Sequence, residues 1–259
     1  MTILIPKLIH LTWKNKTIPD KWKDTIPGWR KLMPGWKIVL WTDEDNRKYI
    51  QEKQPYFLET YDRFPYNIQR ADAIRCFILR DFGGVYSDMD ILPIKNIEPY
   101  LSGVSADAIL VYSGNVDTYT NSFMASRRES PFWDLLIEEM MRGEVPWYAM
   151  VKHTYIMETT GPGLLNRVAK SYLGAIANLP REVFMAYNID NHHEYKEHAA
   201  LFPLQGSSWL NPTEVILYRI IFKIYLHRYM ILILLILIIY LYPKIRMPNI
   251  KSKIIWKKR

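Results

Sequence analysis

Short apolar runs alternate with amphipathic stretches through the first 214 residues of the chain. The apolar runs are rich in β-branched and aromatic residues and predict strands at 3–13, 36–41, 85–87, 108–112, 122–125 and 183–187. The amphipathic stretches predict helices at 19–33, from 42 onward, at 65–82, 131–141 and 163–177. Alternation of strands and helices with crossover connections predicts an α/β fold, in which helices cover both faces of a mostly parallel sheet.

The octet Gly-Gly-Val-Tyr-Ser-Asp-Met-Asp at 83–90 carries the clearest chemical signal. If the apolar stretch is a strand, its side chains repeat with period two, and Asp88 and Asp90 leave the same face. Two hard oxygen ligands at a strand end suit a divalent cation that also holds a diphosphate. Gly83 and Gly84 permit a tight turn and let a ligand approach the backbone. The alternative is a pair of solvated loop aspartates.

A second charged pair lies in the helix predicted just before the glycines. Asp72 and Arg75 are three residues apart and therefore share one helix face. The carboxylate can accept a hydrogen bond from a sugar hydroxyl, and the planar guanidinium can bind a phosphate or sugar oxygen. A surface ion pair is the alternative, but the position one helix ahead of the Asp-x-Asp favours a functional role.

The last 45 residues differ from the rest of the chain. Residues 229–242 form an unbroken apolar run, which extends back to Ile224 and is bracketed by tyrosines. We therefore expect a single membrane span at about 224–242 within a segment 215–259, following a catalytic domain at 1–214. A buried core helix is the alternative, disfavoured because the run is apolar all round. The orientation of the span is left open.

The charge distribution separates the tail from the domain. Ten of the 34 basic residues and none of the 26 acidic residues follow Glu214. The domain therefore carries no basic excess, which argues against a nucleic-acid partner. The lone cysteine, Cys76, excludes an intrachain disulfide and is expected to be a buried thiol.

The order of these motifs resembles glycosyltransferase family 32, the DXD sugar-binding glycosyltransferases. This group includes fungal α-1,6-mannosyltransferases and the catalytic subunit of mannosyl-inositol-phosphorylceramide synthase. The similarity spans about residues 3–210. It rests on Ile-Pro-Lys-Leu-Ile-His-Leu-Thr-Trp at 5–13, the stretch 36–43, Arg-Ala-Asp-Ala-Ile-Arg at 70–75, the octet 83–90, Thr-Gly-Pro-Gly at 160–163 and Gly-Ser-Ser-Trp at 206–209.

The resemblance implies a GT-A fold, a nucleotide-sugar donor, and Mn²⁺ (or Mg²⁺) held by Asp88 and Asp90. Both aspartates would act in catalysis together with Asp72 and Arg75, which would contact the sugar. The other donor-binding residues would be His10, Trp13, Gly84, Tyr86, Ser208 and Trp209. Related sequences often have a histidine where this chain has Leu210, so Asn211 or a water is left as the third metal ligand.

We accordingly expect a retaining transferase that moves a hexose, mannose from GDP-mannose, to a glycolipid or glycan acceptor. A UDP-sugar transferase and a catalytically inactive membrane-anchored scaffold are the alternatives. The expected surroundings are the lipid bilayer of a Golgi- or ER-type endomembrane, or a host membrane if the chain is viral. Whether a regulatory membrane subunit accompanies the chain is left open.

Overall fold

The computed structural model describes residues 5–113, 118–149, 151–184 and 198–204, with positions 213, 227, 232, 234, 235 and 237–239. The chain divides into two compact units, Met1–Gly206 and Ser207–Arg259. The predicted domain boundary near 214 and the role of the second segment stay predictions.

A six-stranded sheet forms the centre of the first unit, in the order β2-β1-β3-β6-β5-β7. Its strands are β1 (Leu8–Trp13), β2 (Lys37–Thr42), β3 (Gly84–Ser87), β5 (Ala108–Val111), β6 (Phe123–Ser126) and β7 (Ile176–Leu179). Strand β1 is parallel to both β2 and β3, and β5 is parallel to β7, whereas β6 is antiparallel to β3 and β5. The predicted, mostly parallel α/β sheet is therefore confirmed. A separate ribbon pairs β4 (Ile91–Pro93) with β8 (Leu201–Pro203).

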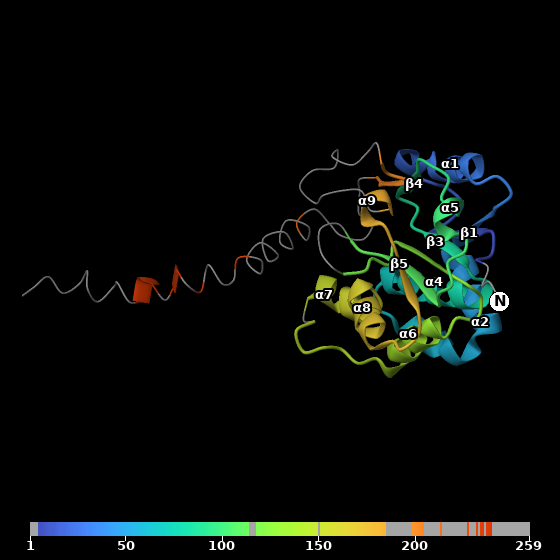
Figure 1. The fold of residues 1–259 in the computed structure, drawn as a ribbon. Coiled ribbons are helices and arrows are strands. Elements are labelled where there is room, and N and C mark those ends of the chain that lie inside the picture. The colour runs from blue at the N-terminus through green and yellow to red at the C-terminus, as the bar shows by residue number, and fades with distance from the viewer. Residues whose placement is uncertain are drawn as a thin grey trace, which may run out of the picture. The chain divides into compact units, whose positions relative to one another are not determined.

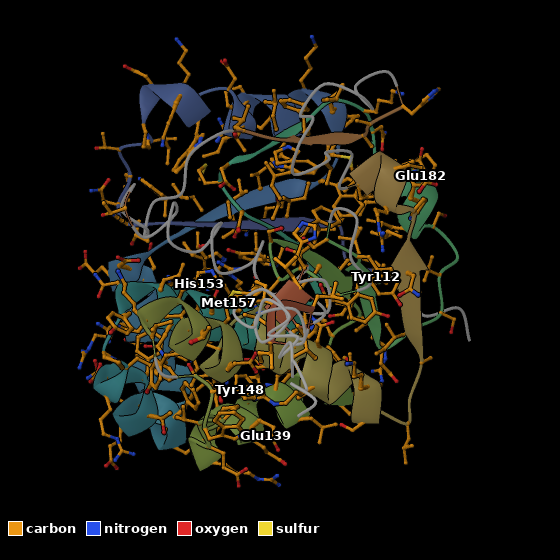
Figure 2. The ribbon with its side chains drawn as sticks, turned by 90° about the vertical axis from the view of Figure 1, so that its left-hand side faces the viewer. Tyr112, Glu139, Tyr148, His153, Met157 and Glu182 are labelled. Atoms are coloured by element: carbon orange, nitrogen blue, oxygen red, sulfur yellow. The ribbon has the colours of Figure 1, made fainter. Side chains whose placement is uncertain are left out.

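Helices cover both faces of the sheet, as Figure 1 shows. On the upper side in this view lie α1 (Thr25–Leu32), α5 (Glu98–Leu101) and α9 (Arg181–Phe184). The lower side holds α2 (Asp43–Lys53), α3 (Leu58–Arg63), α4 (Asn67–Phe82), α6 (Pro131–Arg142), α7 (Lys152–Thr159) and α8 (Pro162–Ser171). Figure 2 turns to the side of α7, with His153 and Met157 on this helix and Tyr112 just after β5. Two short 3₁₀ turns, Asp20–Trp22 and Pro55–Phe57, lead into α1 and α3.

Strand periodicity divides the buried side chains into two cores. Val85 and Ile109 pack in the core that contains Trp29 of α1. Their neighbours Tyr86 and Leu110 pack in the other core, with the helices α4, α6 and α8. The sheet is consequently buried on both faces, as parallel sheets require. Cys76 is buried on α4 as expected, and burial raises the pKa of its thiol to about 12.

Two element predictions near the end of the domain are wrong. The helix predicted for 163–177 ends at Ser171, and residues 176–179 form strand β7 instead. A Cβ at Gly174 would stand 2.5 Å from an Asp107 carboxylate oxygen, so close packing on this loop favours glycine and the chain turns back to the sheet. The strand predicted for 183–187 is helical in its described part, because α9 begins at Arg181 after Pro180.

No helix among the described residues is both long enough and apolar enough to cross a membrane. Most of the predicted span at about 224–242 lies outside the described residues. The described leucines and isoleucines within it, including Leu232, Leu235 and Ile239, are helical and expose about half or more of their surface. The predicted anchor therefore stays a prediction.

The two glycines after α4 set the entry into β3. Gly83 and Gly84 have φ values of +63° and +91°, which side-chain-bearing residues rarely adopt. A Cβ on Gly84 would lie 2.6 Å from the carbonyl oxygen of Leu8 on β1. The neighbouring strand thus fills the side of Gly84 on which a Cβ would stand. The predicted contact of Gly84 with the donor stays a prediction.

We expect Gly84→Ala to lower the free energy of unfolding by at least about 1–3 kcal/mol, because it combines a strained φ with a clash against β1. Urea denaturation followed by circular dichroism would measure the change. Gly35→Ala is the matched comparison: its φ is +83° but no atom lies within 4 Å of the added Cβ. Equal losses in both variants would contradict the role of the β1 contact.

Candidate active site

Helix α4 and strand β3 bring the predicted acidic residues to the sheet edge where β1, β2 and β3 end. Asp72 and Arg75 lie on one face of α4, and Asp88 directly follows β3. In open α/β sheets, ligands bind beyond the carboxyl ends of the strands, often where the chain direction across the sheet changes. The step from parallel β3 to antiparallel β6 provides such a point here.

Arg75 is the centre of the cluster. One of its nitrogens, Nη2, lies 3.2 Å from Oδ1 of Asp72 and 3.1 Å from Oδ1 of Asp88. The other, Nη1, donates a hydrogen bond of 2.9 Å to the carbonyl oxygen of Asn121. The side chains of Arg75 and Asp72 are each only 5 % exposed, whereas that of Asp88 is 26 % exposed. Arg75 therefore lies beneath the Asp-x-Asp and holds it from inside.

Asp72 is satisfied by protein donors on both oxygens. Asn121 donates to Oδ1 at 3.0 Å, and the hydroxyl of Thr160 donates to Oδ2 at 3.2 Å. Burial raises the pKa of Asp72 to about 6, while the charge of Arg75 acts in the opposite direction. These contacts make Asp72 the anchor of Arg75 in this structure. Direct contact of Asp72 or Arg75 with a sugar stays a prediction.

A chain of hydroxyls orients Asp88 from the other side. The Tyr86 hydroxyl donates to Oδ1 of Asp88 at 2.8 Å, and Thr12 lies 2.8 Å from the same hydroxyl. Because the Tyr86 proton points to the carboxylate, Thr12 donates to Tyr86. Tyr86 is fully buried, and the Arg75 guanidinium carbon lies 4.8 Å from its ring centroid. Tyr86 thus positions Asp88 in this structure, and its predicted contact with the donor stays a prediction.

The Asp-x-Asp lies in a turn, so the prediction that both aspartates project from one strand face is wrong. Strand β3 ends at Ser87, and the Ile91 amide donates to the Asp88 carbonyl at 3.2 Å, which closes the turn. The Asp88 amide donates to the carbonyl of Ser122 at 2.8 Å. The Asp90 carbonyl accepts from Leu204 at 2.6 Å, so strand β8 braces the other end.

Asp90 is the member of the cluster without a cationic partner. Among the described residues no ion pair reaches its carboxylate, which accepts a hydrogen bond from the backbone amide of Asp90 itself. Burial, and then the charge of Asp88, raise the pKa of Asp90 to about 7. Burial likewise raises the pKa of Asp88, against the effect of Arg75. Asp72, Asp88 and Asp90 together face one buried cation, so a surplus of negative charge is left at the turn.

This donor set fits a divalent cation. Hard carboxylate oxygens are the ligands that Mn²⁺ and Mg²⁺ prefer, and Asp90 lacks a protein cation. In the described ranges, no group of three or more His, Cys, Asp or Glu side chains is placed to bind one metal ion. Asp88 and Asp90 would accordingly hold the ion with diphosphate oxygens and water as further ligands. The alternative third ligand Asn211 lies outside the described residues.

His10 does not reach the site. Its Nε2 donates to the Gly83 carbonyl at 3.1 Å, and the Trp41 indole donates to its Nδ1 at 3.1 Å. Burial lowers the pKa of His10 to about 4, so the ring is neutral at physiological pH. With both nitrogens used and 1 % of the residue exposed, His10 ties β1 to the Gly83 turn. The predicted donor contact of His10 stays a prediction.

The remaining predicted site residues are Trp13, Ser208 and Trp209. Trp13 is partly exposed at the end of β1, where its indole donates to Thr17 at 3.0 Å and its ring packs edge-on against Trp22. Ser208 and Trp209 lie outside the described residues. Asn121, Thr12 and Thr160 were not predicted as site residues. Thr12 and Thr160 had a signal, since they belong to the motifs at 5–13 and 160–163, whereas Asn121 had none.

Comparison with known proteins places this site in a family. The crystal structure of a glycosyltransferase involved in the glycosylation of the major capsid of PBCV-1 matches with a TM-score of 0.50 at 12 % identity. The match covers 78 % of this chain and 96 % of that one. At this identity the match shows the fold alone, and the fold is that of a GT-A-like glycosyltransferase. More particularly, residues 19–109 match the model described as "Glycosyltransferase sugar-binding region containing DXD motif", and this region includes Asp72, Arg75, Asp88 and Asp90.

Curated relatives are consistent with this assignment. The chain is 36 % identical over 169 residues to the mannosyl phosphorylinositol ceramide synthase SUR1 of Saccharomyces cerevisiae, covering 65 % of this chain and 43 % of that protein. It is 28 % identical over 209 residues to inositol phosphoceramide mannosyltransferase 2 of Schizosaccharomyces pombe, covering 80 % of this chain and 59 % of that protein. The chain thus spans about half the length of these relatives. The predicted family is confirmed.

We expect Asp90→Asn to abolish most sugar transfer, by about 100-fold or more, because stabilisation of the leaving group is lost. The same change should stabilise the metal-free protein at pH 8 by about 1–2 kcal/mol, after allowance for partial exposure. Since the folded-state pKa is raised, ionising Asp90 costs stability as pH rises from about 4 to about 7. The gain should therefore vanish below pH 4, where Asp90 is protonated in both states. Thermal unfolding across pH would measure it; a gain independent of pH would refute the burial argument.

We expect Arg75→Lys to reduce transfer about 10–100-fold, because one ammonium cannot bridge Asp72, Asp88 and the Asn121 carbonyl as the planar guanidinium does. It should also lower the free energy of unfolding by about 1–3 kcal/mol. Arg47→Lys is the stability control, because Arg47 pairs with Asp62 at an exposed site and should change stability by less than about 0.5 kcal/mol. Wild-type transfer in Arg75→Lys would show that Arg75 does not orient Asp88.

Proposed function

We propose that this chain transfers a mannosyl group from GDP-mannose to a glycolipid of the inositol phosphoceramide type, with retention of the anomeric configuration. Mn²⁺ (or Mg²⁺) would be held by Asp88 and Asp90. The observation that carries the proposal is the buried Arg75. It forms an ion pair with Asp88 of the Asp-x-Asp, whereas Asp90 is left without a cationic partner among the described residues. A charged group kept without a counterion in a folded protein calls for a cationic ligand.

The protein's own contribution is positioning. Arg75, Tyr86 and the Ser122 carbonyl hold Asp88 on three sides, so the first aspartate is in place before substrate arrives. A bound divalent cation offsets the charge that develops on the departing diphosphate. Because α4 and β3 are rigid elements of the core, this arrangement needs little reorganisation during the reaction.

The geometry supports front-face substitution over a covalent intermediate. Asp72 has both oxygens bonded to protein donors and is nearly fully buried, so it is a poor nucleophile. Asp88 and Asp90 belong to one turn and cannot flank a scissile bond from opposite sides, as the two carboxylates of glycoside hydrolases do. The leaving diphosphate would then accept the proton of the acceptor hydroxyl.

The relatives supply the sugar and the acceptor in this proposal. Their names describe mannosyl transfer to inositol phosphoceramide. The match covers 43 % and 59 % of SUR1 and of inositol phosphoceramide mannosyltransferase 2. The family region 19–109 includes the helix and turn that carry Asp72, Arg75, Asp88 and Asp90.

We expect the purified chain to transfer labelled mannose from GDP-mannose to inositol phosphoceramide in mixed micelles with Mn²⁺. Transfer should stop when EDTA removes the ion. UDP-galactose, UDP-glucose and UDP-N-acetylglucosamine should give at most a few per cent of this rate. Thin-layer chromatography of the labelled lipid would measure transfer, with Asp90→Asn as the inactive control. Transfer from a UDP-sugar would establish the alternative donor class, and no transfer from any donor would favour the scaffold alternative.

A membrane anchor in the second segment would bring the enzyme to a lipid acceptor. The support is the apolar run 224–242, whose described leucines and isoleucines are exposed to solvent and would gain by transfer into lipid. The basic residues after Pro243 would add attraction to anionic headgroups. An endomembrane of the ER or Golgi, or a host membrane if the chain is viral, is the location that we propose.

We expect a chain shortened to residues 1–209 to bind donor as the full chain does, because the whole Asp-x-Asp cluster lies before residue 206. Transfer to a lipid in vesicles should fall about tenfold or more below transfer to a soluble mannoside, since the acceptor is no longer met at a high local concentration. Calorimetry and the two acceptor assays would measure this. Equal losses on both acceptors would mean that residues 210–259 belong to the catalytic fold.

A further inference from the structure

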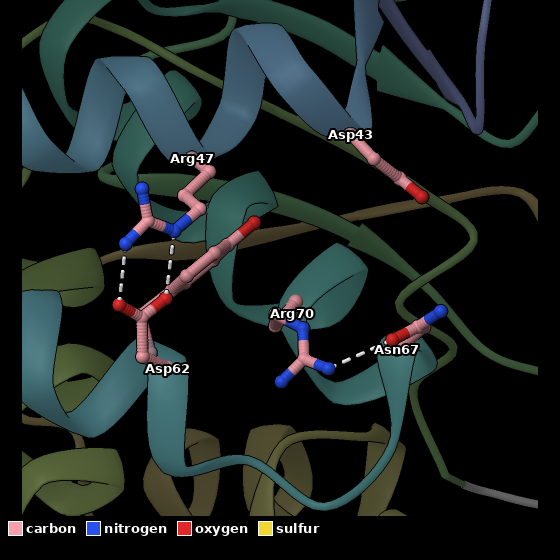
Figure 3. A pocket seen from close by; sticks show the side chains of 6 residues that line it. Asp43, Arg47, Asp62, Asn67 and Arg70 are labelled. Carbon is pink, nitrogen blue, oxygen red and sulfur yellow. Dashed lines mark hydrogen bonds and ion pairs between the residues drawn. The ribbon is translucent and has the colours of Figure 1, made fainter.

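A pocket of about 460 Å³ lies apart from the Asp-x-Asp, between the first turns of α2 and α4 (Figure 3). None of the acidic cluster residues lines it. Its lining consists of charged, amide and phenol side chains: Asp43, Arg47, Tyr61, Asp62, Asn67 and Arg70. The pocket is therefore polar and offers several hydrogen-bonding groups to an occupant.

The pocket lies at the same sheet edge as the proposed diphosphate site. Asp43 directly follows β2, and its amide donates to the carbonyl of Lys14, just beyond β1. Asn67 opens α4, the helix that carries Asp72 five residues later. At 1.5 Å per residue, these two positions are roughly 8 Å apart along the helix axis. This separation is on the scale of a nucleoside between its base and its diphosphate.

Asp43 takes no part in the cap of its own helix. Asp43 begins α2, but the helix is capped by Thr42 and Asp45. Partial burial raises the pKa of Asp43. The residue is nevertheless exposed, so its carboxylate is accessible to a ligand in the pocket that it lines.

The remaining groups are fixed by one another. Arg47 donates two hydrogen bonds, of 3.0 and 2.8 Å, to Asp62. Arg70 donates to Oδ1 of Asn67 at 2.7 Å, which turns the amide nitrogen of Asn67 away from it. In Figure 3 that nitrogen faces the side of the pocket where the Asp43 carboxylate also points, away from the Arg47–Asp62 pair. The pocket thus presents the two carboxylate oxygens of Asp43 as acceptors beside the amide nitrogen of Asn67 as donor.

We propose that this pocket binds the guanine base of the donor nucleotide and that Asp43 is the residue that selects it. The inference rests on the proposed function and extends it to the base. Guanine presents two adjacent donors, N1–H and N2–H₂, beside the acceptor O6. The Asp43 carboxylate accepts from both donors, and the Asn67 amide donates to O6.

The other bases do not complement this set. Uracil has a single N–H between two carbonyl oxygens, so one of these would face a carboxylate oxygen. Adenine and cytosine place an unprotonated ring nitrogen where the carboxylate needs a donor. A site built on a charged acceptor rejects a base that lacks the matching donor, because the carboxylate is then left unpaired.

Dissociation constants of GDP, IDP and UDP, measured by calorimetry on the 259-residue chain with Mn²⁺, test the proposal. IDP differs from GDP only in lacking the 2-amino group. Wild-type protein should bind GDP about 10–100-fold more tightly than IDP, as expected for one hydrogen bond to a charged group. In Asp43→Asn, the GDP:IDP ratio should fall to about one. Because Asp43 lies outside the capping pair, the variant should unfold at the wild-type temperature.

Two further variants make the result specific. Asp62→Asn changes a carboxylate of the same pocket that is already paired with Arg47, and should keep the wild-type GDP:IDP ratio. Asn67→Leu removes the donor to O6, which both nucleotides carry, and should weaken both without changing their ratio. An unchanged ratio in Asp43→Asn, or tighter wild-type binding of UDP or IDP than of GDP, would overturn the guanine assignment. Failure to bind any of the three nucleotides would instead reject the proposed function itself.

Discussion

The ion pairing of Arg75 with Asp72 and Asp88 is the constraint on which the site depends. A guanidinium inside the protein needs partners for its charge, and here two carboxylates and the Asn121 carbonyl meet its two terminal nitrogens, while its buried Nε has no hydrogen-bond partner. Removal of one partner would leave the others buried and unpaired. The pairing therefore fixes the first turns of α4 relative to the end of β3, and it sets where the Asp-x-Asp begins.

The same pairing gives the two aspartates of the motif different electrostatic environments. Asp88 is neutralised from inside by Arg75 and receives a hydrogen bond from Tyr86. Asp90 has neither, and its raised pKa reflects burial beside a second negative charge. One aspartate is thus rigidly placed, while the other keeps its capacity for a cation. A ligand that brings a divalent ion would relieve this charge, which links the electrostatics of the turn to donor binding.

The proposed donor site follows the carboxyl edge of the sheet. The pocket at Asp43 and Asn67 lies by the first turn of α4, and Asp72 and Arg75 on the same helix contact the Asp-x-Asp turn. Under this proposal the helix would couple base recognition to the placement of the diphosphate. Changes in α4 should consequently affect affinity and transfer together, whereas changes at Asp43 should alter the choice of base.

The sequence by itself determined the α/β alternation, the helix before the glycines and the identity of Asp72, Arg75, Asp88 and Asp90, because periodicity and motif order are local properties. Only the tertiary structure decided that Arg75 lies buried beneath the motif and that Tyr86 and His10 are internal. These outcomes depend on contacts between residues far apart in the chain, such as Thr12 with Tyr86 and Trp41 with His10. Strand β7 was likewise missed, because it exists only through pairing with β5.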